Sequence, residues 1–243
     1  MAPRRAFRPE RHTLHILALQ TSGRLASLAA LSTDDQQVNL VDEVVLPEDQ
    51  RTAQSLLPAL RELLDQGGWK SGSIELVCAA TGPGSFTGLR IGITVAKTWA
   101  YATGAALVGV HTLAALAGGT PRKYPRLWTI LDAQRQALFT ACFAAGGPTS
   151  NAARPETQIV GIDDWLAHLR PGDAVVGPPL KKLAPRLPAE VVALDAAYWE
   201  PRASVVGRLG YAAFQQGRCV EPMQLAPEYF RQSAAEEKAA RTS

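Results

Sequence analysis

Thr81-Gly82-Pro83-Gly84-Ser85-Phe86-Thr87-Gly88-Leu89-Arg90-Ile91-Gly92 is the stretch that decides how this chain folds. An apolar run at 74–80 precedes it and has the character of a buried strand, and a helical pattern follows it to about Tyr101. A strand, a Gly-Pro-Gly turn and a helix N-terminus can present backbone N–H groups to an anion. The segment also places a small residue every four positions, at Gly84, Gly88, Gly92 and Ala96. One helix face is therefore nearly bare and suits close approach by another helix.

The charge of the chain is confined to its first residues. The 243 residues are 47% hydrophobic, enough to fill a core, and carry a formal net charge of +3. All of this charge comes from the first eleven residues, where four arginines stand against one glutamate. Residues 12–243 are neutral overall, which does not support a basic body that binds nucleic acid unaided. The composition of residues 1–12 predicts a disordered basic tail, with a weak contact to RNA as the alternative.

The cysteines and the apolar runs indicate the compartment. Cys78, Cys142 and Cys219 are far apart and form no C-x-x-C motif, so neither a disulfide framework nor a zinc site is indicated. Their apolar neighbours predict buried thiols in a reducing compartment. The apolar run at 15–19 is interrupted by polar residues, and no stretch approaches the ~20 apolar residues of a membrane span. We expect a cytoplasmic protein that does not enter a membrane.

The apolar pattern predicts an α/β protein with two lobes. In the N-terminal lobe, 13–111, strands are expected at 14–19, 25–31, 38–46, 74–80 and 105–110. The glycine-rich helix lies between the last two of these strands. A leucine-rich helix precedes them, stopped by Gly67-Gly68, and Pro58 either places its start near Ser55 or kinks it.

The C-terminal lobe, 112–231, is expected to continue the α/β pattern, and a frayed tail is expected at 232–243. Its strands are predicted at 127–132, 137–143, 174–177 and 190–194, and its helices at 164–169, 181–187 and 204–216. Residues 146–151 are expected to form a loop. Asp163 is predicted to cap the first of these helices. No sequence repeat of 20 to 50 residues is present.

Two antiparallel strands with a polar turn, followed by a sheet with helices, resemble the superfamily of sugar kinases, actin and heat-shock ATPases. In active members, the resemblance implies, the first hairpin carries an acidic residue that holds Mg²⁺. Here the matching place reads Leu19-Gln20-Thr21-Ser22-Gly23, and Gln20 is neutral where magnesium needs a carboxylate. A second phosphate loop would fall on Val176-Gly177-Pro178-Pro179-Leu180, where two prolines remove N–H groups. We therefore expect a degenerate nucleotide site and no cofactor.

Other chemistry has weak support. The glycine-rich turn lacks the Lys-Ser/Thr of a P-loop and the order G-x-G-x-x-G. The four histidines form no H-x-x-x-H pair, so no metal site is expected. Ser85 lacks the G-x-S-x-G elbow, and we expect it to cap the following helix, although a Ser-His-Asp triad with distant partners stays open. No catalytic residue is assigned.

Residues 82–92, followed by Ala96-Lys97, resemble the signature of the bacterial TsaB family, also called YeaZ. The resemblance covers roughly residues 13–231 and is strongest from 78 to 116. It departs from the family at Gln20, where an Asp is usual, at Gln54, where a His is common, and in the turn at 133–137. Similar pieces are found at Leu17–Ser22, Gln54–Pro58, Val110–Leu116, Asp132–Arg135 and Pro227–Arg231.

The resemblance implies a non-catalytic paralogue of TsaD, the subunit that transfers the threonylcarbamoyl group to tRNA. It also implies pairing with TsaD through helices of the N-terminal lobe, an ATPase partner, TsaE, and contact with tRNA only within the complex. A leucine stripe and the glycine face are the expected interface, namely Leu56, Leu57, Leu60, Leu64, Gly88, Leu89, Gly92, Ile93 and Ala96.

Three alternatives accompany this interpretation. Both faces could pack inside the monomer, or they could form a homodimer in the absence of a partner. The chain could instead be an enzyme in its own right, a small-molecule kinase or ATPase or a Gcp-like peptidase. The interface hypothesis predicts that Gly92→Leu blocks heterodimer formation and leaves the fold intact.

Overall fold

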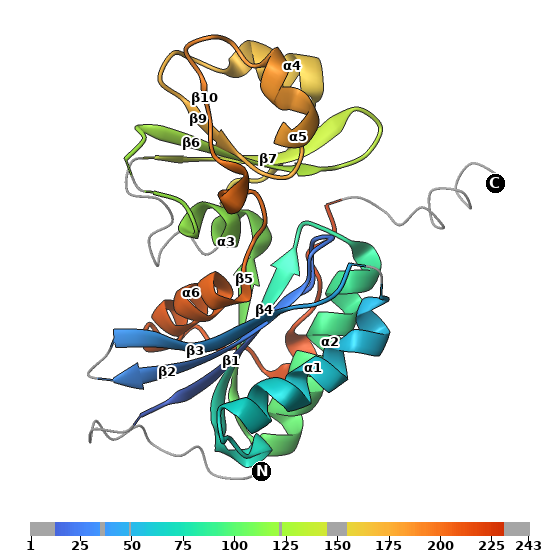
Figure 1. Cartoon of the computed structure of the whole chain (residues 1–243), viewed down its shortest axis with the longest axis vertical. Helices are drawn as coiled ribbons and strands as arrows, with labels where there is room; N and C mark the ends of the chain where they lie inside the picture. Colours follow the sequence, from blue (N-terminus) through green and yellow to red (C-terminus); the bar gives the residue numbers. More distant parts are fainter. Residues whose placement is uncertain (1–12, 35–36, 49, 122, 145–154, 231–243) are drawn as a thin grey trace, which may run out of the picture.

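The computed structural model describes residues 13–34, 37–48, 50–121, 123–144 and 155–230. They form two α/β lobes, one above the other in Figure 1. The expected tails at 1–12 and 232–243 and the loop predicted at 146–151 lie outside the described residues. Among the described residues, none of the helices is both long enough and apolar enough to cross a membrane.

The first sheet, sheet A, has five strands in the order β3-β2-β1-β4-β5. The first three pair antiparallel, whereas β4 runs parallel to β1 and β5 parallel to β4. The predicted strands are confirmed, with small shifts at their ends. Their bounds are β1 (His15–Gln20), β2 (Ser27–Asp34), β3 (Gln37–Val45), β4 (Ile74–Gly82) and β5 (Ala106–His111).

The second sheet, sheet B, has the order β10-β9-β6-β7-β8. Read from β8, it repeats sheet A: three antiparallel strands, then β9 parallel to β6 and β10 parallel to β9. The structure is therefore duplicated in topology although the sequence shows no repeat. Strand β8 was not predicted. The bounds are β6 (Arg126–Asp132), β7 (Ala137–Ala144), β8 (Gln158–Gly161), β9 (Ala174–Val176) and β10 (Val192–Ala193).

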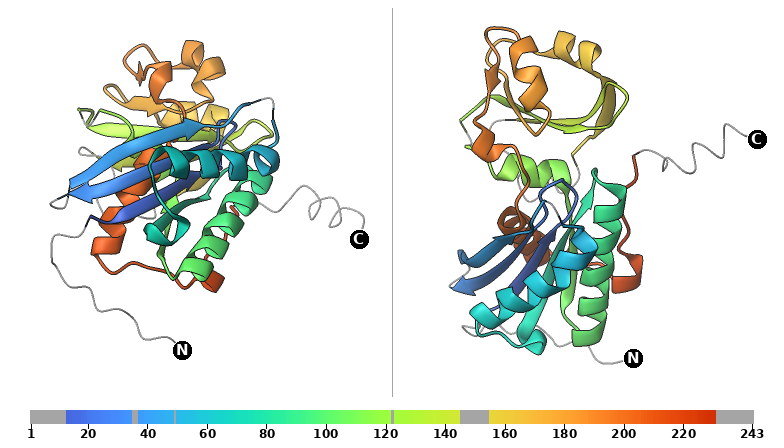
Figure 2. Two further views of the ribbon diagram at one scale, coloured as in Figure 1. Left: turned by 60° about the horizontal axis from the view of Figure 1, so that its bottom comes forward. Right: turned by 45° about the vertical axis from the view of Figure 1, so that its right-hand side comes forward.

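Helices cover both faces of sheet A. Helices α1 (Thr52–Gln66) and α2 (Phe86–Thr103) lie side by side on one face, and α6 (Ala203–Gln215) lies on the other (Figures 1 and 2). Helix α1 contains Pro58 and begins at Thr52, earlier than predicted. Its leucines other than Leu57 pack on sheet A, and Gly68, with φ of +66°, ends it as predicted.

We call the lobe built on sheet A lobe one and the lobe built on sheet B lobe two. Lobe two has shorter helices around its sheet. Helix α4 begins at Ile162 with Gly161 at its N-cap, so the prediction that Asp163 caps it is wrong; the Asp163 carboxylate instead accepts a hydrogen bond from Arg186. Helix α3, between the lobes, was not predicted. The helical elements not yet given are α3 (Thr112–Gly118), α4 (Ile162–His168), α5 (Leu180–Leu183), and the 3₁₀ turns η1 (Ser71–Ser73), η2 (Ala184–Arg186), η3 (Ala196–Tyr198) and η4 (Pro222–Gln224).

Helix α6 belongs with sheet A, although the expected boundary at residue 112 assigned it to the C-terminal lobe. Its first turn is held by two residues of sheet A: Ser27 Oγ accepts from Ala203 N at 3.0 Å, and the Glu43 carboxylate accepts from Ser204 N at 2.9 Å. Apolar residues of α6 share a core with β1 and β4. The chain thus crosses to lobe two after α3 and returns before Ala203.

The cysteine prediction holds for one residue of three. Cys78 is buried in β4, and burial raises its pKa far above the usual range of a thiol. Cys142 and Cys219 are exposed, so the prediction of buried thiols is wrong for them. Cys142 lies near the end of β7, where buried and exposed positions alternate.

Candidate partner-binding face and the pocket along β5

The glycine-rich face of α2 packs against the turn that follows β1. Ser85 N donates to Ser22 O at 2.7 Å, and the Ser85 hydroxyl accepts from Gly88 N at 3.2 Å, which confirms its predicted role as helix cap. A Cβ built on Gly84 would lie 2.2 Å from Ser22 O, and one on Gly88 2.0 Å from Thr21 O. The packing role of this face is confirmed within the chain. The expectation that another helix approaches it is wrong, because this turn fills the space.

Gly92 continues the same contact one turn further along α2. A Cβ built there would lie 2.1 Å from Thr21 Oγ1, and contacts under 3.0 Å force a shift. The expectation that Gly92→Leu leaves the fold intact is therefore wrong, because a leucine would drive the turn away from the helix. This variant cannot separate loss of pairing from loss of fold.

Most of the predicted interface residues lie inside the monomer. Leu57 is 58% exposed, and the other eight are buried, as the alternative of packing inside the monomer requires. Buried side chains shape the two helices from below but offer no surface to a partner. The interface therefore stays a prediction for Leu57 and the outer face of the helices. The buried eight are Leu56, Leu60, Leu64, Gly88, Leu89, Gly92, Ile93 and Ala96.

The outer face of α2 carries aromatic and basic groups that the sequence reasoning missed. Tyr101 is 77% exposed, and Arg90 stacks on the ring of Phe86 with its guanidinium carbon 4.0 Å from the ring centroid. Lys97 Nζ donates to Met223 O at 3.3 Å, so the C-terminal segment borders this face. Spacings of four and seven residues place Phe86, Arg90, Lys97 and Tyr101 on one side of the helix. A search for apolar stripes does not detect this pattern.

Gln20, at the end of β1, fills the place where a nucleotide-binding relative would hold an acidic residue. It is fully buried, and Nε2 donates to Pro201 O at 3.0 Å. Its Oε1 accepts from Ser22 N at 2.5 Å and from Ser22 Oγ at 2.9 Å. An ionised carboxylate could not donate to Pro201 O. The amide of Gln20 therefore ties the β1 turn to the returning chain.

The second candidate phosphate loop, at residues 176–180, also packs against other parts of the chain. Gly177 has φ of +143°, and a Cβ built on it would lie 1.9 Å from Ile130 O. The glycine thus allows close contact with β6. Gly177 O accepts from Leu180 N at 3.1 Å, which leads the chain into α5.

Glu200 is a half-buried carboxyl beside the β1 turn that sequence reasoning did not single out. Its Oε2 lies 3.3 Å from a Cβ built on Gly23. Burial raises the pKa of Glu200, and Glu48 raises it further while Arg24 lowers it. Glu200 directly precedes Pro201, whose carbonyl accepts a hydrogen bond from Gln20 Nε2. This position indicates a place beside the β1 turn only when the fold is known.

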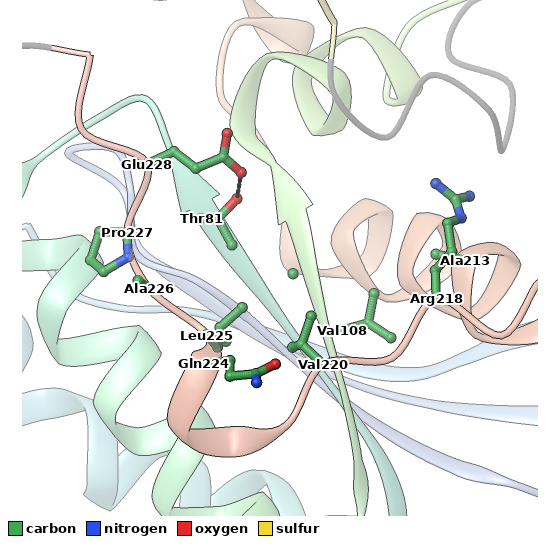
Figure 3. A pocket seen from close by; sticks show the side chains of 11 residues that line it. Thr81, Val108, Ala213, Arg218, Val220, Gln224, Leu225, Ala226, Pro227 and Glu228 are labelled. Atoms are coloured by element: carbon green, nitrogen blue, oxygen red, sulfur yellow. Dashed lines mark hydrogen bonds between the residues drawn. The ribbon is translucent and has the colours of Figure 1, made fainter.

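A pocket of about 560 Å³ lies along β5, between the C-terminal segment and the end of α6 (Figure 3). The Thr81 hydroxyl at its rim donates to Glu228 Oε1 at 3.0 Å, so this contact holds the C-terminal segment. Among the described residues, no three His, Cys, Asp or Glu side chains lie together as a metal site. The lining comprises Thr81, Val108, Gly109, Ala213, Arg218, Val220, Gln224, Leu225, Ala226, Pro227 and Glu228.

Sequence comparisons connect this architecture to known proteins. The family model described as TsaD, tRNA N6-adenosine threonylcarbamoyltransferase, matches residues 45–184. A tRNA threonylcarbamoyladenosine biosynthesis protein TsaB from Bacillus subtilis is 27% identical over 161 residues, 66% of this chain and 68% of that protein. The Escherichia coli protein of the same description is 32% identical over 130 residues, 53% of this chain and 54% of the relative.

Solved structures agree with these matches. A Pseudomonas aeruginosa protein, described as similar to peptidase YEAZ, superposes with a TM-score of 0.72 at 26% identity and covers 90% of this chain and all of that one. A structure described as YeaZ from the same organism gives a TM-score of 0.70 at 26% identity, over 89% of this chain. The predicted fold class, an α/β protein with two lobes, is confirmed.

Proposed function

The chain belongs to the TsaD family and, within it, to the TsaB/YeaZ group, and from this premise we propose that it is a non-catalytic subunit in threonylcarbamoyladenosine modification of tRNA. It pairs with a TsaD-like catalytic paralogue and activates it. A TsaE-like ATPase joins the pair, and tRNA is bound only within the complex. The modification of tRNA takes place in the cytoplasm.

The main support for this proposal is that the chain itself occupies the carboxyl ends of strands β1 and β4 in sheet A. In α/β sheets, ligands bind outside the carboxyl ends of the strands. Here Gln20 ties the end of β1 to Pro201, and Glu228 N donates to Thr81 O at the end of β4 at 2.7 Å. The glycines that could bring a backbone close to phosphate touch Thr21 and Ser22 instead. Such an arrangement supports a role in binding a partner over one in catalysis.

The outer face of α1 and α2 is the surface that we assign to the catalytic partner. Leu57 of α1 and Tyr101 of α2 are large and exposed, and the core beneath them makes the two helices rigid. Helix α2 has two basic residues, Arg90 and Lys97, and no acidic one. The partner surface should therefore be apolar with an acidic margin. A stable pair of this kind buries roughly 1,600 Å².

The test is a titration of this chain with the TsaD-like protein of the same source, followed by sizing chromatography without and with ATP and tRNA. The wild type should form a one-to-one complex. Leu57→Asp and Tyr101→Asp should each weaken it about tenfold or more, since each places a charge in the interface. Val192→Asp is the matched control, because Val192 is 41% exposed on sheet B.

Two results would contradict the proposal. One is the absence of any association in all four conditions. The other is a complex that tolerates both helix variants and fails with the sheet B control. A homodimer that Leu57→Asp or Tyr101→Asp dissolves, and that the TsaD-like protein displaces, would show that one face serves both kinds of pair.

An enzyme of the same superfamily is the competing function, and the similarity of the Pseudomonas protein to a peptidase favours testing it. A thermal shift with Mg²⁺-ATP separates nucleotide binding from the subunit function. Ligand that binds only the folded state must stabilise it. We expect no shift for this chain alone, and a rise of several degrees would favour the kinase or ATPase hypothesis. Peptidase activity is checked separately, as hydrolysis of unstructured peptides.

A further inference from the structure

The C-terminal strap, residues 225–230, follows a path that joins separate parts of the molecule. After α6 the chain passes the edge of β5, where Val220 N donates to Leu107 O at 2.9 Å. The η4 turn then rests against α2, and the strap runs back to the carboxyl ends of β4 and β5 (Figures 1 and 3). It ends between the two lobes.

The first half of the strap contact belongs to sheet A and α2. Two hydrogen bonds join Glu228 to Thr81. The backbone N of Glu228 donates to Thr81 O at 2.7 Å, and Thr81 Oγ1 donates to Glu228 Oε1 at 3.0 Å. Tyr229 stacks on Phe86 with ring centroids 4.9 Å apart. The Tyr229 hydroxyl accepts a hydrogen bond from Arg90 Nε at 2.8 Å.

The next residue reaches the other lobe. The Phe230 ring lies 6.1 Å from the ring of Phe139 on β7 and 5.8 Å from that of His111, the last residue of β5 and the N-cap of α3. Phe230 packs against the core of sheet B. The His111 ring also lies within 3.1 Å of Thr157 Oγ1, just before β8. Consecutive residues of the strap thus hold sheet A, α2 and sheet B.

We propose that the strap is an interlobe clamp, which takes the place at the carboxyl ends of β4 and β5 where α/β proteins receive a ligand. A ligand in that place would draw two lobes together by contacting both. Here Glu228 and Tyr229 contact one lobe and Phe230 contacts the other. The chain itself therefore fixes the angle between the lobes. This inference is independent of whether the chain pairs with a catalytic subunit.

The strap is packed at both of its ends. Leu225, at its start, is 5% exposed and lies in the core that sheet A shares with α1 and α2. The contacts of residues 228–230 hold the other end. The pocket of about 560 Å³ borders residues 224–228 (Figure 3). Loss of the contacts of residues 228–230 would release the link between the lobes and leave Leu225 in place.

Hydrogen exchange of the full-length chain tests the clamp. Phe230→Ala should speed exchange about tenfold in β7 and in the His111–Gly118 segment, because the lobes open more often. Tyr229→Ala should speed exchange in the same segments, although Tyr229 contacts lobe one. Met223→Ala is the matched control, since its side chain is 79% exposed on η4. Residues 27–45 should exchange at the same rate in all variants.

The Tyr229→Ala result decides between a clamp and a local contact. If Phe230 merely fills a gap beside Phe139, Tyr229→Ala leaves β7 unchanged, and the proposal is overturned. Faster exchange in residues 27–45 as well would indicate general destabilisation and would also overturn it. A larger radius of gyration in solution scattering should accompany both strap variants and not the control.

Discussion

The two lobes connect five strands in the same order, but the strands differ in length and cover. In sheet A, β4 and β5 have nine and six residues, and long helices lie on both faces. Their counterparts in sheet B, β9 and β10, have three and two residues, and α4 and α5 are short. The same topology therefore supports a large helix-covered sheet in one lobe and a smaller unit with short strands and short helices in the other.

The turns that join the first two strands of each sheet show the same divergence. In lobe one this turn is filled by the glycine face of α2, so that Thr21 and Ser22 touch helix backbone. In lobe two it is a tight turn in which Gln134, Arg135 and Gln136 all have positive φ. Asp132 Oδ1 stabilises that turn by accepting from Gln134 N at 2.7 Å. Packing against α2 fills the first turn, and three consecutive positive φ angles mark the second.

The largest expected effect tests whether the small lobe depends on one side chain. Trp165 of α4 is 1% exposed and lies in a core with Ile130 and Leu180. Trp165→Ala should cost about 4 kcal/mol of the free energy of unfolding. Because the loss falls on sheet B, thermal unfolding should separate into two steps. A single step at an unchanged temperature would show that Trp165 does not dominate the small lobe.

A glycine of α2 tests the larger lobe in the same way. Gly88→Ala forces a Cβ against Thr21 O and should cost about 3 kcal/mol, since backbone must move. Gly119→Ala is the control, because a Cβ there meets nothing closer than 3.6 Å. Circular dichroism on heating measures both. Equal melting temperatures for the two variants would contradict the packing of α2 on the β1 turn.

Placing an acidic group at the end of β1 tests how much the Gln20 amide contributes to the stability of the first lobe. Gln20→Glu removes the donor to Pro201 O and buries a carboxylate, at a cost of about 2 kcal/mol near neutral pH. Burial should raise the pKa of this carboxyl in the folded state, so the loss should grow as pH rises above about 4.3. A variant as stable as the wild type at pH 7 would show that the amide is not needed.

The smallest expected effect on stability concerns Glu200, whose pKa is raised in the folded protein. A carboxyl with a raised folded pKa favours folding while protonated, and this contribution is lost as pH rises from its unfolded value through its folded value. Glu200→Gln should therefore raise the melting temperature slightly at pH 7 and not near pH 4. An equal gain at both values of pH would assign the effect to packing.

The sequence predicted sheet A well because its strands are long and β1, β2, β4 and β5 are largely apolar and buried. Strand β8 was missed because its residues are exposed or half-buried, and helix α3 because it is buried on nearly every side, so neither alternates between apolar and polar positions. The assignment of α6 depended on chain order, and chain order does not record that the chain returns to sheet A.

The candidate site was predictable in part. The leucine stripe and the glycine spacing located α1 and α2, and Ser85 was identified as a cap. The pattern could not tell a core face from a docking face, because both need small or apolar side chains at the same spacing. Tyr101 and the contacts of Tyr229 depend on how the helices and the strap lie in space.

Hydroxyl-radical footprinting of the chain with its TsaD-like partner tests the central claim most directly, because it reports the exposure of individual side chains. Tyr101 and Leu57 label readily in the free chain if they are as exposed as the structure indicates, and Tyr198 and Ile159 of the second lobe provide the comparison. We predict that saturation with partner protects Tyr101 and Leu57 and leaves Tyr198 and Ile159 unchanged. Protection of the second lobe, with Tyr101 and Leu57 still labelled, would contradict the account.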